Sequence, residues 1–249
     1  GNIESFEDGN FKYWVIDNLL PDDIATKIAR AFPEEEKLRQ RDSLREYKRV
    51  GVDFDTYDKL MEQITYVFHD NEIVKCIEEL TGFHQMIPDR ELYAGGLSSM
   101  TNNSFLNPHL DNSHNDSKTH YRVLNLLYYV SEDWKIENGG NLVLFPYGIH
   151  KESITVISRF NRLVLMETHD KSYHGVSKVK SQIPRRCVSN YYFSKSSTVS
   201  YDYEHVTSFY SFPEEKSWKG VALAIDRNLR TYFSSVYKRI TNHENWHKR

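Results

Sequence analysis

A change of hydrophobic pattern near residue 83 constrains the fold of this 249-residue chain more than any other feature of its sequence. Apolar side chains recur at helical spacing before it, whereas short apolar or alternating runs, separated by Gly, Asn, Asp and Pro, follow it. Short strands with turn residues between them are typical of β-sandwiches and barrels. An aromatic content of 14% also favours strands. The sequence therefore predicts a mainly β protein with flanking helices.

The predicted strands are short, and all but one follow the change of pattern. The early one covers residues 11–16. The later ones span 92–93, 121–130, 141–145, 153–157, 162–166 and 187–193. Such short runs suit a closed or two-layered β structure better than one flat sheet.

Helical spacing is found in three regions of the first 82 residues. Pro21, followed by two aspartates, opens an amphipathic helix with Ile24, Ile28 and Phe32 on one face. Residues 55–69 and 72–80 are also predicted to be helical, and Gly82 provides an ordinary C-terminal stop. The charged stretch 34–49 is expected to be a solvated helix or a loop.

A final helix is predicted over residues 216–241. Its apolar side chains form one stripe: Trp218, Val221, Ile225, Leu229, Phe233, Val236 and Ile240. Such a stripe must be covered, and we expect it to pack on the barrel or on a partner subunit. The second alternative implies a homodimer through this helix.

The chain contains no repeat, no low-complexity stretch and no linker rich in Gly, Ser or Pro. We therefore expect one domain over residues 1–249. It would consist of a mainly helical support (1–82), a β core (83–194) and a C-terminal extension with a long helix (195–249).

Composition excludes several classes of function. A net charge of −3 provides no basic footprint for nucleic acid, and no apolar run is long enough to span a membrane. The polar, acidic N-terminus is unlike a signal peptide, so the cytoplasm is the expected location. Cys76 and Cys187 show no metal-like spacing. We expect both to be small buried side chains rather than a disulfide.

The segment Asn107-Pro108-His109-Leu110-Asp111 is a candidate metal site. Pro108 favours an extended chain, in which His109 and Asp111 project to the same side. An imidazole and a carboxylate together suit a divalent metal, and one more histidine would complete a facial triad for Fe(II).

Later histidines are the candidates for the third ligand. His114 and His120 lie in a polar stretch, whereas His169 and His174 follow the apolar run 162–166. The next strand begins with Arg185 and Arg186, and an Arg near a metal can bind a carboxylate through two parallel hydrogen bonds.

An ordered set of motifs resembles the 2-oxoglutarate/Fe(II)-dependent oxygenase superfamily, specifically its prolyl-4-hydroxylase-like branch. The resemblance covers about residues 90–194 and, more loosely, 11–32. In order, the set consists of Tyr93, Gly95-Gly96, His109 and Asp111, the strand 122–130, Gly139-Gly140-Asn141-Leu142, Asn161-Arg162-Leu163-Val164, His174-Gly175-Val176 and Arg185. The resemblance implies a double-stranded β-helix, or jelly-roll, core.

The family's roles can be transferred residue by residue. His109, Asp111 and His174 would be the catalytic centre and ligate Fe(II). Arg185 would bind the distal carboxylate of 2-oxoglutarate, or Arg186 if the register shifts by one. The family usually has Ser two positions after this Arg, whereas this chain has Cys187. Tyr93 and Asn125 are further candidates for contacts with the co-substrate.

The resemblance implies an oxidoreductase that uses Fe(II), 2-oxoglutarate and O₂, hydroxylates a C–H bond and releases succinate and CO₂. Asp111 disfavours a halogenase, which needs a small residue there. A non-catalytic module of the same fold and a zinc hydrolase with the same ligands are the alternatives, and Arg185 argues against the hydrolase. The substrate is expected to be polar: a small molecule, a sugar or a peptide.

Overall fold

The computed structural model describes residues 2–93, 95–215 and 218–230. Its strands are β1 (Asn2–Asp8), β2 (Phe11–Asp17), β3 (Arg39–Asp42), β4 (Glu46–Gly51), β5 (Ile87–Pro88), β6 (Gly96–Met100), β7 (Phe105–Leu110), β8 (Tyr121–Tyr129), β9 (Leu142–Leu144), β10 (Ile154–Val156), β11 (Arg162–Glu167), β12 (His174–Val176), β13 (Arg185–Ser194) and β14 (Ser208–Phe209). Its helices are α1 (Asp22–Ala31), α2 (Lys59–Tyr66) and α3 (Asn71–Thr81), with 3-10 turns at Glu35–Lys37, Phe54–Thr56, Val67–His69 and Ile136–Asn138. Residues 218–230 form a further helical segment.

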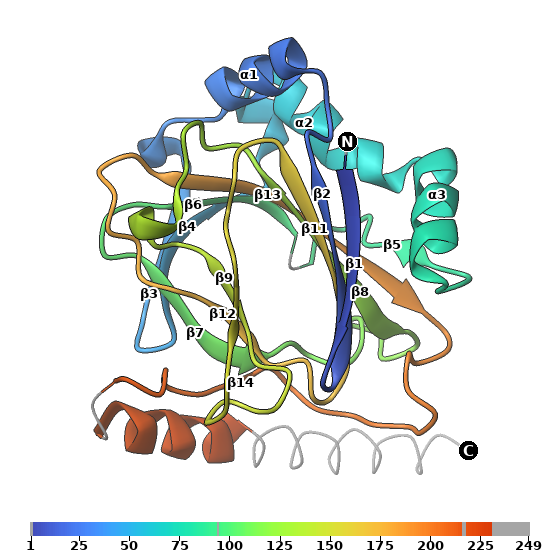
Figure 1. Cartoon of the computed structure of the whole chain (residues 1–249), viewed down its shortest axis with the longest axis vertical. Coiled ribbons are helices and arrows are strands. Elements are labelled where there is room, and N and C mark those ends of the chain that lie inside the picture. Colours follow the sequence, from blue (N-terminus) through green and yellow to red (C-terminus); the bar gives the residue numbers. More distant parts are fainter. Residues whose placement is uncertain (1, 94, 216–217, 231–249) are drawn as a thin grey trace, which may run out of the picture.

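The strands form one curled antiparallel sheet. Their order is β1-β2-β11-β8-β13-β6-β4-β7-β12-β9-β10, with β3, β5 and β14 paired at the sides. Figure 1 shows the sheet wrapped around a central space, with α1 and α2 above it and α3 beside it. The mainly β, jelly-roll architecture predicted from the sequence is confirmed.

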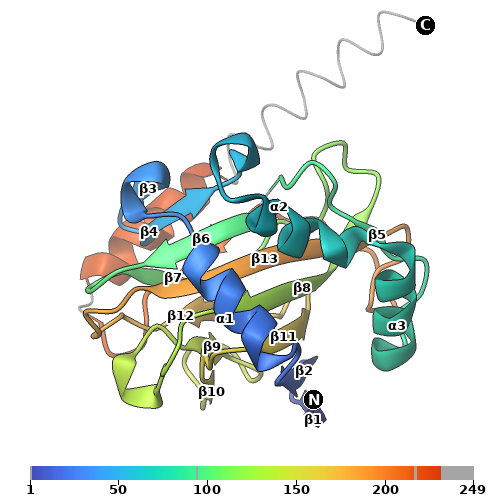
Figure 2. The ribbon, with the colours of Figure 1, turned by 90° about the horizontal axis from the view of Figure 1, so that it is seen from above.

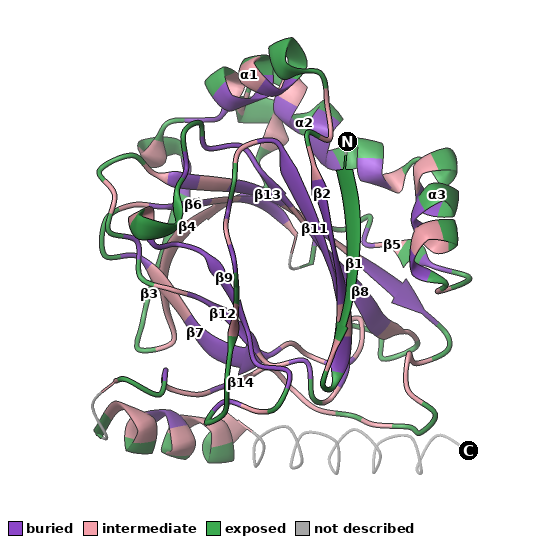
Figure 3. Ribbon diagram, in the orientation of Figure 1, coloured by how far each residue is buried: buried purple, intermediate pink, exposed green. Residues whose placement is uncertain are grey.

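Period-two alternation separates two apolar clusters on the two faces of this sheet. On β2 and β11, Trp14 and Leu165 belong to the larger cluster beneath α1–α3, whereas Val15 and Val164 belong to the cluster inside the curl. Figure 3 shows these central strands as buried. Burying one such aliphatic side chain contributes about 1.5–3 kcal/mol, so the two faces together hold the curl around its interior.

The helices of the first 82 residues lie where the periodicity predicted them. Asp58 and Asp70 cap α2 and α3 by accepting hydrogen bonds from backbone N–H groups two residues on. Gly82, in a left-handed conformation, ends α3. Figure 2 shows that α1 and α2 lie across the upper face of the sheet.

The structure differs from one sequence prediction for this half and adds a strand that was not predicted. Residues 34–49 are not a solvated helix or loop but mostly the β3–β4 hairpin, which pairs with β6 and β7. The polar N-terminus is strand β1, exposed on the edge of β2. Residues 1–82, which were predicted to be a mainly helical support, are therefore helical only in part. Their strands belong to the same sheet as the core.

Three further predictions need correction. Residues 92–93 lie in a turn instead of a strand, with Leu92 at a positive φ of 47°. Both cysteines are free, and Cys187 is buried as expected, but Cys76 is exposed on α3.

The apolar stripe of the C-terminal helix does not cover the barrel. Trp218, Val221, Ile225 and Leu229 are all more than half exposed. The opposite side of the helix packs instead, through Leu223 at 1% exposure. The remaining side chains of the predicted stripe, from residue 231 onward, lie outside the described part of the chain.

Candidate metal centre and carboxylate pocket

His109 and Asp111 are positioned by strand β7, which ends one residue before Asp111. The His109 side chain is 5% exposed, and its ring stacks on Phe209 with centroids 5.1 Å apart. Its Nε2 atom lies 3.5 Å from Oδ1 of Asp111. The predicted projection of both side chains to one side is therefore present in the fold.

His174 begins strand β12 and pairs directly with His109 across the β7–β12 ladder. Gly175 makes this approach feasible, because a Cβ there would lie 2.9 Å from the Leu106 carbonyl oxygen and about as close to Pro108. One ligand atom from each of His109, Asp111 and His174 lies within 4.8 Å of the others. Among the described residues, this is the one group of three such side chains with metal-binding spacing.

Hydrogen bonds set the tautomer of both imidazoles. Nδ1 of His109 donates to the Asn107 carbonyl at 2.9 Å, and Nδ1 of His174 donates to the Ser172 carbonyl at 3.0 Å. Each ring therefore keeps its Nε2 lone pair on the side of Asp111, which is the usual arrangement of histidine ligands. Burial, with the adjacent His109, lowers the pKa of His174 to about 4, so this ring is neutral at pH 7.

Asp111 is held in its charged form by two side chains from β8. Arg122 Nη1 lies 3.2 Å from Oδ2, and Nδ2 of Asn125 donates to the same oxygen at 2.8 Å. Burial would raise the pKa of Asp111, but the Arg122 charge and the histidines hold it well below its ordinary value. A deprotonated carboxylate beside two imidazoles whose Nε2 atoms face it fits a divalent metal.

Arg122 is a candidate site residue that the sequence analysis missed, since it contacts Asp111 and lines the cavity. Its side chain is 1% exposed, stacks over the Tyr191 ring at 4.2 Å, and leaves Nε and Nη2 without a hydrogen-bond partner among the described residues. The only signal for it was its place in the strand that follows the H-x-D motif.

The three candidate ligands lie on the wall of a cavity of about 810 Å³. Asn125 and Arg185 line it with them, as does the edge of the β3–β4 hairpin. This volume is in the range of pockets that hold small molecules.

Strand parity distinguishes the two arginines that begin β13. Arg185 is 4% exposed and lines the cavity, whereas the Arg186 guanidinium lies outside, over the Phe32 ring at 5.2 Å. Arg185 donates from Nε to the Ser158 hydroxyl at 3.3 Å and lies 4.8 Å from the Tyr129 ring centroid. Most of its hydrogen-bonding capacity is therefore still available.

Tyr129 is the second residue that sequence reasoning missed. Its buried hydroxyl lies beside Arg185 and Ser158 but forms no hydrogen bond of normal geometry with any described residue. Burial raises its pKa to about 12, so the group stays a neutral donor. Tyr93, the phenol expected from the sequence, lines the mouth of the same cavity and is 56% exposed.

The other candidate histidines lie outside the cluster. His169 is buried, but its Nδ1 accepts a hydrogen bond from the Lys171 backbone, and its ring packs against Phe11. His114 and His120 belong to the connection between β7 and β8, as the polar composition of this stretch predicted.

No described helix is long and apolar enough to cross a membrane.

Comparisons with known proteins agree with this geometry. Residues 95–194 match the family model of the 2OG-Fe(II) oxygenase superfamily. That superfamily uses Fe(II), 2-oxoglutarate and O₂, the cofactor and co-substrates predicted from the sequence. None of the curated proteins matches the chain in sequence.

Solved structures share the fold at low identity. A Pseudomonas putida prolyl-4-hydroxylase has a TM-score of 0.55 at 16% identity, over 75% of this chain and 93% of its own. A Trichoplax adhaerens prolyl hydroxylase, in complex with a hypoxia inducible factor peptide, has a TM-score of 0.53 at 15% identity, over 74% and 84%. An α-ketoglutarate-dependent epimerase of nogalamycin biosynthesis has 0.53 at 12%, over 85% and 84%. The chain thus resembles the 2OG-Fe(II) oxygenase superfamily in the sequence of residues 95–194, and it shares its fold with solved structures that include prolyl hydroxylases.

Proposed function

We propose that this protein is an Fe(II)- and 2-oxoglutarate-dependent oxygenase that hydroxylates a C–H bond of a polar substrate. The observation that carries the proposal is the cluster of His109, Asp111 and His174 on the wall of a cavity that also contains the buried guanidinium of Arg185. His109, Asp111 and His174 would hold the iron.

Arg185 would bind the distal carboxylate of 2-oxoglutarate, with Tyr129 donating a further hydrogen bond. The support is their burial, their proximity and the unpartnered phenol hydroxyl. A charge-assisted contact in such a site is stronger than one in water. Ser158, which already accepts a hydrogen bond from Arg185, would keep the guanidinium in place.

The remaining residues orient the donor set. Arg122 and Asn125 hold Asp111 so that one carboxylate oxygen is engaged by β8 and the other is directed at His109. The apolar strand faces around the cavity exclude water from the reacting groups. When bound, iron with 2-oxoglutarate and O₂ supplies the oxidising chemistry that converts the C–H bond and releases succinate and CO₂.

Two alternatives use the same three side chains. A zinc hydrolase has no use for a second site with Arg185 and a phenol, and a non-catalytic module has no use for an intact donor set. Epimerisation is known for one neighbour with the same fold. Hydroxylation is the reaction we propose for this chain, on a small-molecule, sugar or peptidyl substrate.

The test is metal binding followed by co-substrate binding. His109→Ala, Asp111→Ala and His174→Ala should each lose Fe(II), whereas His120→Ala should keep it. Metal analysis of the purified proteins measures this. Titration calorimetry should then detect 2-oxoglutarate binding by the metal-loaded protein, with succinate release on a substrate panel as the final readout. Full iron occupancy in His174→Ala, or no 2-oxoglutarate binding, would contradict the proposal.

A further inference from the structure

One wall of the cavity is basic although the chain as a whole is slightly acidic. Hairpin β3–β4 contributes Arg39, Arg41, Arg45 and Lys48, and the helical segment 218–230 contributes Arg230. Only two carboxylates of this wall, Glu46 and Asp53, line the cavity with them. Since the chain carries a net charge of −3, its overall composition does not account for this concentration of positive charge.

The hairpin register places like charges side by side. Arg41 pairs directly with Lys48, and Arg39 pairs with Val50. All four line the cavity, whereas the alternate residue Arg49 points away and pairs with Glu35. Like charges directly opposite each other destabilise a β-pair, so folding alone does not favour this arrangement.

The charges of this wall are only partly compensated. Glu46 alone serves both Arg41, at 3.5 Å, and Lys48, at 3.0 Å. Arg39 forms no ion pair with any described residue, and its side chain is exposed. Arg45 is bound to Asp226 of the helix. Burial and the neighbouring Arg45 both lower the pKa of Arg230, as expected where positive charges crowd.

We propose that Arg39, Arg41 and Lys48 bind an anionic group of the substrate, a phosphate, sulfate or carboxylate, while its reacting carbon faces the metal centre. The proposal rests on the proposed function for the identity of this ligand as a substrate. The guanidinium fork matches oxyanion geometry, and a cleft lined by one sign of charge concentrates ligands of the other. The cavity volume of about 810 Å³ indicates a small molecule.

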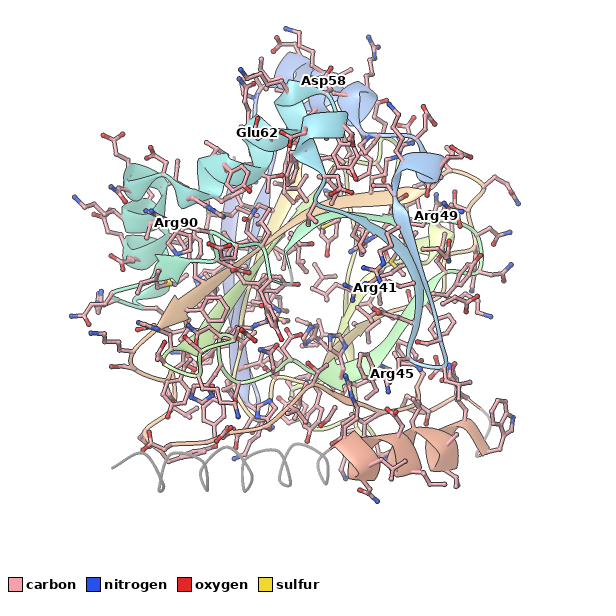
Figure 4. All side chains as sticks on the ribbon, turned by 180° about the vertical axis from the view of Figure 1, so that it is seen from behind. Arg41, Arg45, Arg49, Asp58, Glu62 and Arg90 are labelled. Atoms are coloured by element: carbon pink, nitrogen blue, oxygen red, sulfur yellow. The ribbon has the colours of Figure 1, made fainter. Side chains whose placement is uncertain are left out.

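Arginines away from the hairpin provide control variants, and Figure 4 shows where one of them, Arg90, lies. Arg41 and Arg45 lie along the hairpin, over the opening of the barrel, whereas Arg90 lies on the far side near α3. Arg90→Ala therefore removes one exposed positive charge without touching the cavity wall. Arg185→Ala removes a guanidinium of the cavity that does not belong to the basic wall, at the proposed 2-oxoglutarate site.

The experiment is calorimetric titration of four matched probes: glucose, glucose 6-phosphate, glucose 6-sulfate and glucuronate. The charged probes should bind the wild-type protein at least tenfold more tightly than glucose, and their ranking identifies the anion. Arg41→Ala and Lys48→Ala should each weaken this binding about tenfold. Arg90→Ala should leave it unchanged, and Arg185→Ala should weaken it less than either hairpin variant.

Equal binding of glucose and all three charged probes would overturn the proposal. So would an effect of Arg185→Ala in place of the hairpin variants, since that outcome would put the anion in the co-substrate pocket. Because the titrations use metal-free protein, they remain informative even if the oxygenase proposal fails. A protein that binds the anionic probes but not iron would contradict only the oxygenase proposal. A protein that binds iron but not the anionic probes would contradict only the proposed anion site.

Discussion

At the scale of single residues, the centre is organised by side chains that are not candidate ligands. Two backbone carbonyls select the tautomers of His109 and His174, while Arg122 and Asn125 determine the charge and direction of Asp111. Such supporting contacts commonly change metal affinity by 10–100-fold when removed.

Replacing Arg122 tests this support. Arg122→Met keeps the volume of the stem but removes the positive charge that holds down the pKa of Asp111. We expect metal affinity to fall about 10–100-fold at neutral pH. Competition with a metal chelator measures it, and Arg90→Met is the control. Unchanged affinity would mean that the histidines alone keep Asp111 ionised.

The alternation of side chains along β13 leads to a second prediction about single residues. Arg185→Ala should weaken 2-oxoglutarate binding by about 2–5 kcal/mol, because it removes a charge-assisted contact in a buried site. Tyr129→Phe should cost about 1 kcal/mol. Arg186→Ala is the matched control, since this side chain lies over Phe32 outside the cavity. Calorimetric titration with 2-oxoglutarate decides between them, and a larger effect of Arg186→Ala would contradict the observed register.

At the scale of elements, strand ends are joined by charged contacts across long sequence separations. Arg162 at the start of β11 donates to both carboxylate oxygens of Asp17 at the end of β2, at 2.6 and 2.8 Å. These hydrogen bonds lower the pKa of Asp17, against the opposing effect of burial.

The contact between Arg162 and Asp17 should make the stability of the protein depend on pH. Because the folded-state pKa is lowered, the contribution of Asp17 is complete above its unfolded pKa of about 3.9 and disappears as pH falls through the folded value. Asp17→Asn should therefore cost about 1–2 kcal/mol at pH 7 and almost nothing near pH 2. Urea denaturation at several pH values measures the difference. Exposed Glu79→Gln should show no such trend, and a constant cost for Asp17→Asn would contradict the ion pair.

The C-terminal helix gives an element-scale prediction about assembly. Leu223 is buried, so Leu223→Ala should lower stability by about 2–4 kcal/mol. The exposed stripe should behave differently. Ile225→Glu with Leu229→Glu should leave monomer stability unchanged but abolish the homodimer, which stays a prediction. Sedimentation of wild type and variant tests this, and a wild-type monomer at all concentrations would rule the homodimer out.

At the scale of the whole molecule, the candidate ligands come from β7 and β12, neighbours in the part of the sheet that closes the curl. A metal bound there would connect strands that meet only in the folded state. Anything that binds the folded state alone stabilises it by mass action.

Removal of the metal should therefore lower the melting temperature. At a metal concentration 100 times the Kd, the stabilisation is about 2.7 kcal/mol, which corresponds to roughly 5–10 °C for a chain of this length. Differential scanning calorimetry with Mn(II) and with chelator measures it. His174→Ala should show no such difference. An equal shift in that variant would indicate metal binding elsewhere.

Local pattern by itself predicted the H-x-D motif, four strands between residues 121 and 166, the strand at 187–193, and the three N-terminal helices. The reason is that side-chain periodicity records which residues share a face, so the common side of His109 and Asp111 can be predicted from their spacing alone. The choice between Arg185 and Arg186 stayed open in the sequence, because a shift of one residue in the register exchanges them. The role of Arg185, and the domain boundaries, stay predictions.

Only the tertiary structure decided which faces are covered. The charged stretch 39–51 becomes a hairpin because β6 and β7 supply its hydrogen-bond partners, which lie some fifty residues away in sequence. The apolar stripe of the last helix is exposed because Leu223 and the Arg45–Asp226 pair attach the other face. Tyr129 meets Arg185 only through the pairing of β8 with β13. Such contacts depend on long-range pairing, which no local window of sequence contains.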